Sequence, residues 1–293
     1  MGPLSGIKIV DLSTVLMGPF ATQTLGEMGA DVIKVEAPDG DVIRQVGPAR
    51  HAGMGALFLN ANRNKRSLCL DLKQSEAREA LLALVRDADV FVHNLRPQAI
   101  ARLGLDYARL APTCPRLVYA HLTGFGSAGP YADRPAYDDL IQGASGLSAW
   151  MASSGDGTPR YVPTALADRV VGMAAMGAIC AALFERERTG QGQALQVPMF
   201  ETMVGFVLAD HLAGQSFDPP LPGDGYGRLL SPHRRPYRTR DGHVCALVYT
   251  DRHWASFLSA IDMADLPARD PRFAGFAART THIDAVYAFL GEQ

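Results

Sequence analysis

The chain of 293 residues has a formal net charge of -2, with 47% hydrophobic and 20% charged residues. These proportions exclude a disordered chain and predict one large core, or one core with a smaller satellite. Because no overall positive field is present, nucleic acid binding is not expected, and an anionic ligand would need a local cluster of Lys and Arg.

The N-terminal part of the chain alternates between β-branched runs and helical patterns. Strands are expected at 7–12 and 31–36, joined by a helix with Pro19 in its first turn and Gly29 at its C-terminal cap. The alternation continues with a strand at 67–72, a helix at 75–87, a strand at 89–94, a helix at 97–103 and a strand at 116–122. This order predicts the α/β class, with a doubly wound, Rossmann-like parallel sheet and ligands at the carboxyl ends of its strands.

Those strand ends are followed by loops rich in Gly, Pro or polar residues, where functional residues are expected. The loops span residues 13–18, 36–41, 94–98 and 123–130.

The second half of the chain begins with a strongly apolar helix, expected from Arg169 to Arg188 and buried on nearly all sides. Further elements are expected at 193–199 (strand), 200–213 (helix), 237–248 (hairpin), 253–261 (helix) and 282–290 (helix). Several Pro and Gly residues between 214 and 236 indicate a linker. The expected domains are a large Rossmann-like domain at 1–199, a linker helix and loop at 200–222, and a small α+β domain at 223–293. The small domain is expected to be partial, because no clear closing element precedes Gln293.

Asp168 stands just before the predicted buried helix and has two interpretations. Its carboxylate can act as an N-cap for that helix, which is the more common role of an aspartate at such a position. Alternatively, it is a carboxylate nucleophile kept ionised by the helix dipole. The two roles are compatible, since one oxygen can cap while the other attacks.

The run of residues 62–66 contains three cations, Arg63, Lys65 and Arg66, just before a predicted strand. A solvated turn explains such a run, and so does a site for a phosphate-rich cofactor. The glycine-rich segment 223–227 is likewise either a flexible linker or a lid over a reactive intermediate.

Several site classes find little support in the sequence. The first strand is not followed by G-x-G-x-x-G, which disfavours NAD. No histidine or cysteine spacing suits a metal, and no G-x-S-x-G elbow suits a serine hydrolase. Four widely spaced cysteines and the absence of long apolar runs or a leader pattern lead us to expect a soluble cytoplasmic protein with no membrane partner.

Ordered segments across nearly the whole chain closely resemble the family III CoA-transferases, which include formyl-CoA and carnitine CoA-transferases. The segments are 4–12, Gly18-Pro19, 29–36, 62–67, Gly124-Phe125-Gly126, Gly129-Pro130-Tyr131 and 186–193. The resemblance implies a CoA-transferase that moves CoA from an acyl-CoA to a carboxylic acid through an aspartyl-CoA thioester. It also implies an interlocked homodimer, with acyl-CoA as substrate and no tightly bound cofactor.

The same resemblance assigns roles to single residues. It places the catalytic aspartate on Asp168 and the glycine lid on the segment that contains Gly225 and Gly227, although Asp224 and Tyr226 interrupt that segment here. It implies that the cationic run helps to bind CoA. Other CoA contacts are implied at Val15, Leu16, Met17, Leu70, Asn94, Leu95, Arg102, Tyr137 and Met199.

One departure from a related family's pattern helps to distinguish CoA transfer from racemisation. The α-methylacyl-CoA racemases have a His-Asp pair where this chain has Tyr137-Asp138, so the histidine proton carrier is missing. Transfer is therefore favoured over racemisation, and Asp138 is expected to contact substrate or orient the reacting carboxylate. The alternatives are a racemase or isomerase of the same superfamily, and a non-catalytic acyl-CoA binding protein.

Overall fold

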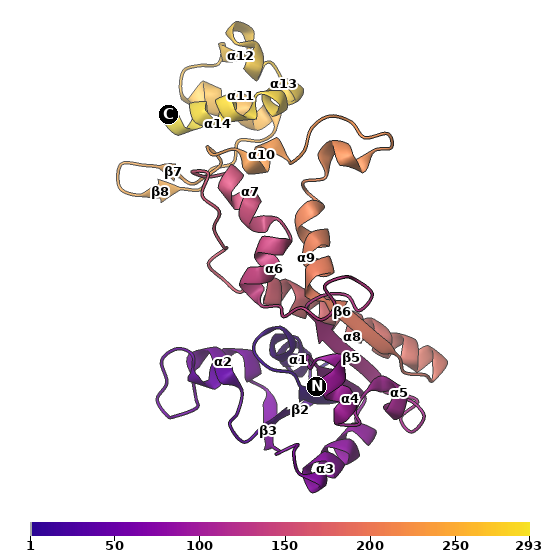
Figure 1. Cartoon of the computed structure of the whole chain (residues 1–293). Helices are drawn as coiled ribbons and strands as arrows, with labels where there is room; N and C mark the ends of the chain where they lie inside the picture. The colour runs from indigo at the N-terminus through magenta and orange to yellow at the C-terminus, as the bar shows by residue number, and fades with distance from the viewer. Residues whose placement is uncertain (1) are drawn as a thin grey trace. The chain divides into compact units, whose positions relative to one another are not determined.

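A six-stranded parallel sheet lies at the centre of the first part of the computed structural model, which describes residues 2–293 (Figure 1). Its order is β3-β2-β1-β4-β5-β6. The strands are β1 (Lys8–Leu12), β2 (Asp31–Glu36), β3 (Lys65–Cys69), β4 (Val90–His93), β5 (Val118–Thr123) and β6 (Ala194–Pro198). The predicted doubly wound α/β fold is confirmed. The strand order reverses between β1 and β4, which is where doubly wound sheets bind their ligands.

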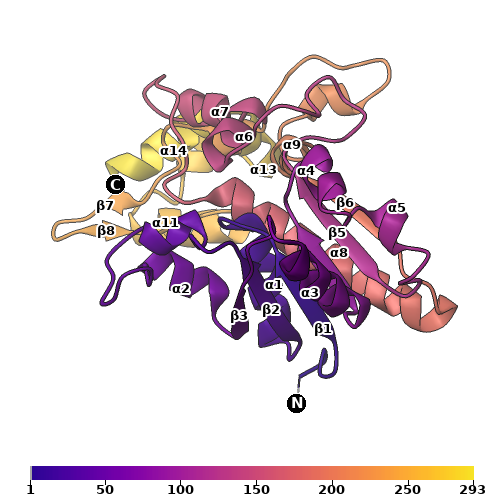
Figure 2. The ribbon, with the colours of Figure 1, turned by 60° about the horizontal axis from the view of Figure 1, so that its bottom comes forward.

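Helices cover both faces of this sheet (Figure 2). Alternation along β1 explains the two faces. Val10 and Leu12 pack into a core with residues of α3 (Ser75–Arg86), whereas Asp11 accepts a hydrogen bond from Thr22 of α1 (Met17–Glu27). The helices of this part are α1 (Met17–Glu27), α2 (Ala56–Asn62), α3 (Ser75–Arg86), α4 (Pro97–Arg102), α5 (Tyr107–Leu110), α6 (Asp138–Ala144), α8 (Leu166–Thr189) and α9 (Met199–Leu208), with a 3₁₀ turn at Val42–Gln45.

Helix α8 is the element that positions the candidate nucleophile. It starts at Leu166, three residues before the predicted start. By length and composition alone, α8 could also cross a membrane. Its packing against α1, β5 and β6 accounts for the apolar composition instead. No other helix of residues 2–293 meets that length and composition test.

The chain divides into two compact units. The first contains the sheet and extends to Ser145, resuming over Val162–Phe206, and the second comprises Gly146–Tyr161 and Val207–Gln293. The elements of the second unit are α7 (Leu147–Ser153), α10 (Gly227–Leu230), β7 (Tyr237–Arg238), β8 (His243–Val244), α11 (Asp251–Ala260), α12 (Leu266–Arg269), α13 (Phe276–Thr281) and α14 (Ile283–Glu292), with 3₁₀ turns at Ala213–Ser216 and Pro271–Phe273. Its own core is built around Trp254, Phe273 and Tyr287.

Several local predictions need correction. The hairpin exists, but its strands have only two residues each. The helix expected at 200–213 ends at Leu208, and β3 starts and ends earlier than expected. Helix α3 begins at Ser75, as expected, and ends at Arg86, one residue earlier than expected.

Candidate functional site

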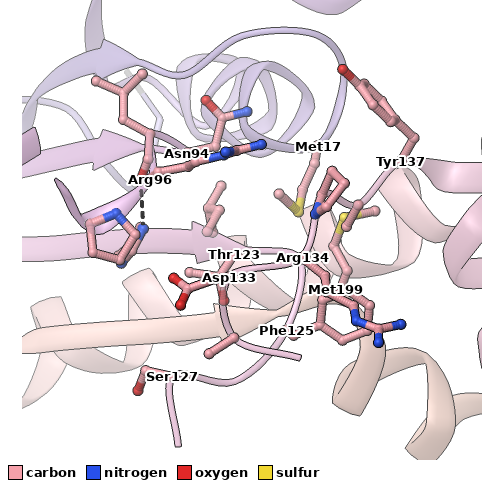
Figure 3. Close-up of a pocket in the computed structure, with 18 of the residues that line it drawn as sticks. Met17, Asn94, Arg96, Thr123, Phe125, Ser127, Asp133, Arg134, Tyr137 and Met199 are labelled. Carbon is pink, nitrogen blue, oxygen red and sulfur yellow. Dashed lines mark hydrogen bonds between the residues drawn. The ribbon is translucent and has the colours of Figure 1, made fainter. Parts of the chain in front are cut away.

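Two cavities lie at the carboxyl ends of the strands in the first unit. The larger has a volume of about 540 Å³ and is lined by residues of the loops after β1, β4 and β5, by the start of α6 and by α8 (Figure 3). The second, of about 400 Å³, is mostly apolar and lies around the ends of β1, β2 and β3 and along α4. Thr14 and Leu95 line both cavities. Such volumes are typical of small-molecule sites, and the shared walls suit one extended ligand.

Asp168 lies in the first turn of α8 and lines the larger cavity. The residue is only 9% exposed, and its carboxylate accepts no hydrogen bond from residues 2–293. Burial raises the pKa of Asp168 to about 7, with a further rise from the negative charge of Asp138 and an opposing effect of Arg169. A helix dipole stabilises a nearby anion by about 0.3–1 kcal/mol, whereas a shift of this size corresponds to several kcal/mol. Desolvation therefore outweighs the dipole, contrary to the expectation that the dipole keeps Asp168 ionised.

Asp138 performs the capping role that the sequence suggested for Asp168. One oxygen of the Asp138 carboxylate accepts a hydrogen bond from the backbone N–H of Asp168 at 2.9 Å. The other accepts from the Gln142 amide at 2.6 Å, and the amide oxygen of Gln142 accepts from Val162 N–H at 2.9 Å. The N-cap residue Ala165 offers no side-chain cap. The N-cap interpretation of Asp168 is therefore wrong, because α8 begins at Leu166 and Asp168 lies inside its first turn, with its own N–H capped by Asp138.

The β1–α1 loop is held by a buried ion pair. Val15 has a φ of +68°, which is strained for a β-branched residue, and its N–H donates to the Asp41 carboxylate at 3.1 Å. The Lys34 ammonium lies 3.2 Å from Asp41 and donates to the Ser13 carbonyl at 2.8 Å. Both charged side chains are fully buried. This ion pair fixes the loop that presents Val15 and Met17 to the larger cavity.

The loop after β4 is fixed by polar contacts on both sides. The Asn94 amide accepts from Thr14 N–H at 3.1 Å and donates to the Thr14 carbonyl at 3.0 Å, which joins the ends of β1 and β4. Leu95 N–H donates to Nδ1 of His93 at 3.3 Å, and Nε2 of His121 lies 2.9 Å from the Leu95 carbonyl oxygen. Because Nδ1 of His93 accepts, its Nε2 carries the hydrogen and donates to the Tyr119 hydroxyl at 2.7 Å. Burial lowers the pKa of His93 to about 2, so this ring stays neutral.

Most of the residues implied as CoA contacts lie at the two cavities. Those at the larger cavity are Val15, Met17, Asn94, Leu95, Tyr137 and Met199, and those at the second are Leu70, Leu95 and Arg102. Leu16 lines neither, because its side chain is buried in a small core with Ile43, Phe58 and Ala61. The two candidate carboxylates, Asp138 and Asp168, both line the larger cavity.

The cationic run lies at neither of the two cavities. The Lys65 ammonium is buried and donates to Asp11 at 2.9 Å, the Pro19 carbonyl at 2.8 Å and Asn62 at 2.8 Å. These three acceptors use all of its hydrogens, so the expectation of a phosphate contact is corrected for this residue. Arg63 and Arg66 pair with Glu27 and Asp31, both at 2.6 Å, and line neither cavity.

Other cations occupy the cavity walls instead, and the sequence did not single them out. Arg96 and Arg134 line the larger cavity, and Lys73 lines the second. Arg134 lies 4.1 Å above the ring of Tyr131. Arg96 follows directly on Asn94 and Leu95, within one of the loops predicted to be functional, but nothing in its neighbours distinguished it from a surface arginine.

The predicted glycine lid belongs to the second unit. Gly225 has a φ of +75°, which favours glycine, and a Cβ added there would lie 2.5 Å from a methyl group of Leu230. Gly225 N–H donates to the His211 carbonyl at 3.0 Å, and Gly227 begins α10. Their catalytic role stays a prediction. No group of three His, Cys, Asp or Glu side chains suited to a metal occurs within residues 2–293.

Comparison with known proteins agrees with the family resemblance seen in the sequence. The family described as CoA-transferase family III matches residues 4–292. Succinate–glutarate CoA-transferase of Agrobacterium fabrum is 37% identical over 96% of this chain and 71% of its own length. Acetyl-CoA:oxalate CoA-transferase of Acetobacter aceti is 37% identical over 99% of this chain and 74% of its own length.

Solved structures agree in fold as well as in sequence. A CAIB/BAIF family protein from Brucella suis is 34% identical, with a TM-score of 0.79, over 99% of this chain and 78% of that chain. Rv3272 from Mycobacterium tuberculosis is 32% identical, with a TM-score of 0.83, over 99% of this chain and 77% of that chain. A match over nearly every residue, at this identity and with this fold, shows that the chain belongs to CoA-transferase family III.

Proposed function

We propose that this protein is a CoA-transferase, of the class that transfers sulfur-containing groups, with Asp168 as its covalent nucleophile. The observation that carries the mechanism is the state of the Asp168 carboxylate. It lines a cavity of about 540 Å³ and accepts no hydrogen bond from residues 2–293, while its backbone is held by Asp138. An oriented carboxylate with free oxygens is what a nucleophile in acyl transfer requires.

The two cavities suggest how CoA is bound. The second cavity, with apolar walls and Lys73 and Arg102 at its edge, would take the nucleotide part. The larger cavity would take the thioester and the acid, beside Asp168. Thr14 and Leu95, which line both, would contact the pantetheine arm between them. No metal or resident cofactor enters this proposal, since acyl-CoA is the substrate.

The reaction proceeds in four steps, in which an acyl group is transferred alternately to a carboxylate and to the CoA thiolate. Asp168 attacks the donor thioester, forming an acyl-aspartyl anhydride and releasing the CoA thiolate. The thiolate attacks the aspartyl carbonyl, which releases the donor acid and leaves an aspartyl-CoA thioester. The acceptor carboxylate attacks that thioester, forming a second anhydride and releasing the CoA thiolate. The thiolate then attacks the acceptor acyl carbon, which gives the acceptor acyl-CoA and frees the Asp168 carboxylate. Each step exchanges one acyl bond for another, so no water, oxidant or external base is consumed.

The pKa of about 7 for Asp168 suits this chemistry. A carboxylate that is poorly solvated and more basic than a free acid is a stronger nucleophile toward a thioester. It is also still substantially ionised at neutral pH. Asp138 contributes to both properties, because its charge raises the pKa and its oxygen holds the Asp168 backbone.

Trapping of the intermediate tests the mechanism directly. The protein is incubated with succinyl-CoA and hydroxylamine, and the peptide containing Asp168 is analysed by mass spectrometry. A hydroxamate on Asp168, with loss of CoA exchange in Asp168→Ala, is the expected result. Continued exchange in that variant would contradict the mechanism.

Two other outcomes point to the alternative functions. Incorporation of solvent deuterium at the α-carbon of an acyl-CoA, without any acceptor acid, would indicate a racemase or isomerase. Binding of acyl-CoA with neither exchange nor labelling would indicate a binding protein.

The proposal includes a homodimer in the cytoplasm. Helix α8 leaves Met173 and Phe184 more than half exposed on its outer surface, which suits contact with another chain. All four cysteines are free, which suits a reducing compartment. Light scattering coupled to gel filtration tests the dimer, since a monomeric mass at micromolar concentration would contradict it.

A further inference from the structure

A third cavity lies wholly within the second unit and plays no part in the proposed reaction. Its volume is about 280 Å³, and its walls come from α10, α11, α13, α14 and the segment before α11. It shares no lining residue with the two cavities of the first unit. The volume is close to the lower end of the range for ligand sites, which is about 300–1,000 Å³, so the occupant would be a small molecule.

The lining of this cavity contains two arginine side chains with unused hydrogen-bond donors. Arg228 donates from Nε to the Tyr287 hydroxyl at 2.8 Å, and its guanidinium carbon lies 5.2 Å from the centroid of the Tyr249 ring. Its terminal nitrogens make no hydrogen bond or ion pair within residues 2–293. Arg279 is buried and paired with Asp251, yet its Nε has no acceptor within the described chain. No aspartate or glutamate lines the cavity. A wall with two arginines and unused N–H groups is complementary to an anion.

The remaining walls are aromatic. Tyr249 and Phe276 are 41% and 47% exposed and meet edge to face, with 5.5 Å between ring centroids. Trp254 lies beside Arg279, whose guanidinium carbon is 5.6 Å from its ring centroid. Exposed aromatic side chains gathered around a concave site are typical of surfaces that bind apolar groups.

We propose that this cavity binds a small organic acid with an aromatic or bulky apolar body. The carboxylate would pair with the terminal nitrogens of Arg228, and the body would pack against Tyr249, Trp254 and Phe276. Tyr226, which also lines the cavity, belongs to the glycine-rich segment 223–227. The bound acid would therefore contact the segment that carries Gly225, and the site is independent of whether Asp168 acts as a nucleophile.

Tryptophan fluorescence provides the test, because the chain has only two tryptophans. In a Trp150→Phe background, Trp254 is the single reporter, and phenylacetate is the probe, titrated to millimolar concentration. We expect a saturable change in emission. We expect 2-phenylethanol, which has the same body without the charge, to bind at least about tenfold more weakly.

Variants in the same background locate the site. Arg228→Gln should weaken phenylacetate binding about tenfold or more, and Arg228→Lys, which keeps the charge, should lie between it and the parent. Arg238→Gln, an exposed arginine on β7 that lines none of the three cavities, is the matched control and should change nothing. Arg134→Gln, in the Asp168 cavity, should also leave the affinity unchanged.

Three results would overturn the proposal. The first is no saturable response to phenylacetate in the folded parent. The second is equal affinity in the parent, Arg228→Gln and Arg228→Lys, with native circular dichroism for all three. The third is loss of binding in Arg134→Gln, which would place the acid in the catalytic cavity instead. None of these results depends on hydroxamate labelling of Asp168. Failure of the proposed binding site can therefore be distinguished from failure of the proposed function.

Discussion

The Asp138 carboxylate accepts a hydrogen bond from the backbone N–H of Asp168 at 2.9 Å, and so holds in place a residue whose own carboxylate it repels. The same side chain therefore supports the start of α8 and raises the pKa of the candidate nucleophile. These two effects can be separated by substitution.

Removal of the Asp138 side chain should loosen the start of α8. We expect Asp138→Ala to lower the free energy of unfolding by about 0.5–2 kcal/mol, the usual cost of losing a helix-capping side chain. Asp138→Asn keeps an oxygen that can accept from Asp168 N–H and should lose less. Urea denaturation monitored by circular dichroism measures the difference. Equal stability of Asp138→Ala and the wild type would show that the hydrogen bond contributes little.

The pH dependence of CoA transfer should follow the ionisation of Asp168. Because the carboxylate must be ionised to attack, kcat/KM is expected to fall as the pH decreases through about 7. Asp138→Asn removes the nearby negative charge, so its midpoint should lie at lower pH than that of the wild type. Initial rates with saturating acceptor acid between pH 5 and 9 test both statements. A midpoint near 4 in the wild type would contradict the raised pKa.

The ionisation of Asp168 also makes the stability of the folded protein depend on pH. The pKa of Asp168 is about 7 in the folded protein and 3.8 in the reference state, so the folded state binds more protons between these values. Stability from this group therefore falls as pH rises from about 4 to 7. Asp168→Asn lacks this loss and should gain on the order of 1–4 kcal/mol relative to the wild type between pH 4.5 and pH 8. Thermal unfolding of both proteins at the two pH values measures the gain, and an unchanged difference would contradict the raised pKa.

The buried ion pair behind the β1–α1 loop should be important for folding. Lys34→Met would leave the fully buried Asp41 carboxylate without its cation, at an expected cost of about 3–5 kcal/mol. Lys73→Met is the matched control, because Lys73 is exposed and should change stability by no more than about 0.5 kcal/mol. Chemical denaturation compares the two. Similar midpoints for both variants would contradict the structural role of Lys34.

The sheet was predictable because its strands are compact β-branched runs in regular alternation with helices, a local signal. The site was not, because its contacts join residues distant in sequence. The phosphate interpretation of Lys65 failed since its partner Asp11 lies 54 residues earlier. Asp168 looked like a cap because the apolar pattern predicted a helix start at Arg169, whereas α8 begins at Leu166 and its first turn is capped by Asp138, 30 residues earlier. Only the family resemblance favoured the nucleophile over the helix cap as the role of Asp168.

The position of Asp133 and Arg134 in the wall of the larger cavity has a consequence for substrate preference. These exposed side chains line the larger cavity from a loop between β5 and α6, whereas Asp168 and the buried network behind it lie on other segments. Substitutions of Asp133 and Arg134 would touch neither the buried core nor the helix that bears the nucleophile. Under the proposed mechanism, the preference for one acid over another could therefore diverge between related proteins at little cost in folding, while the chemistry stays constant.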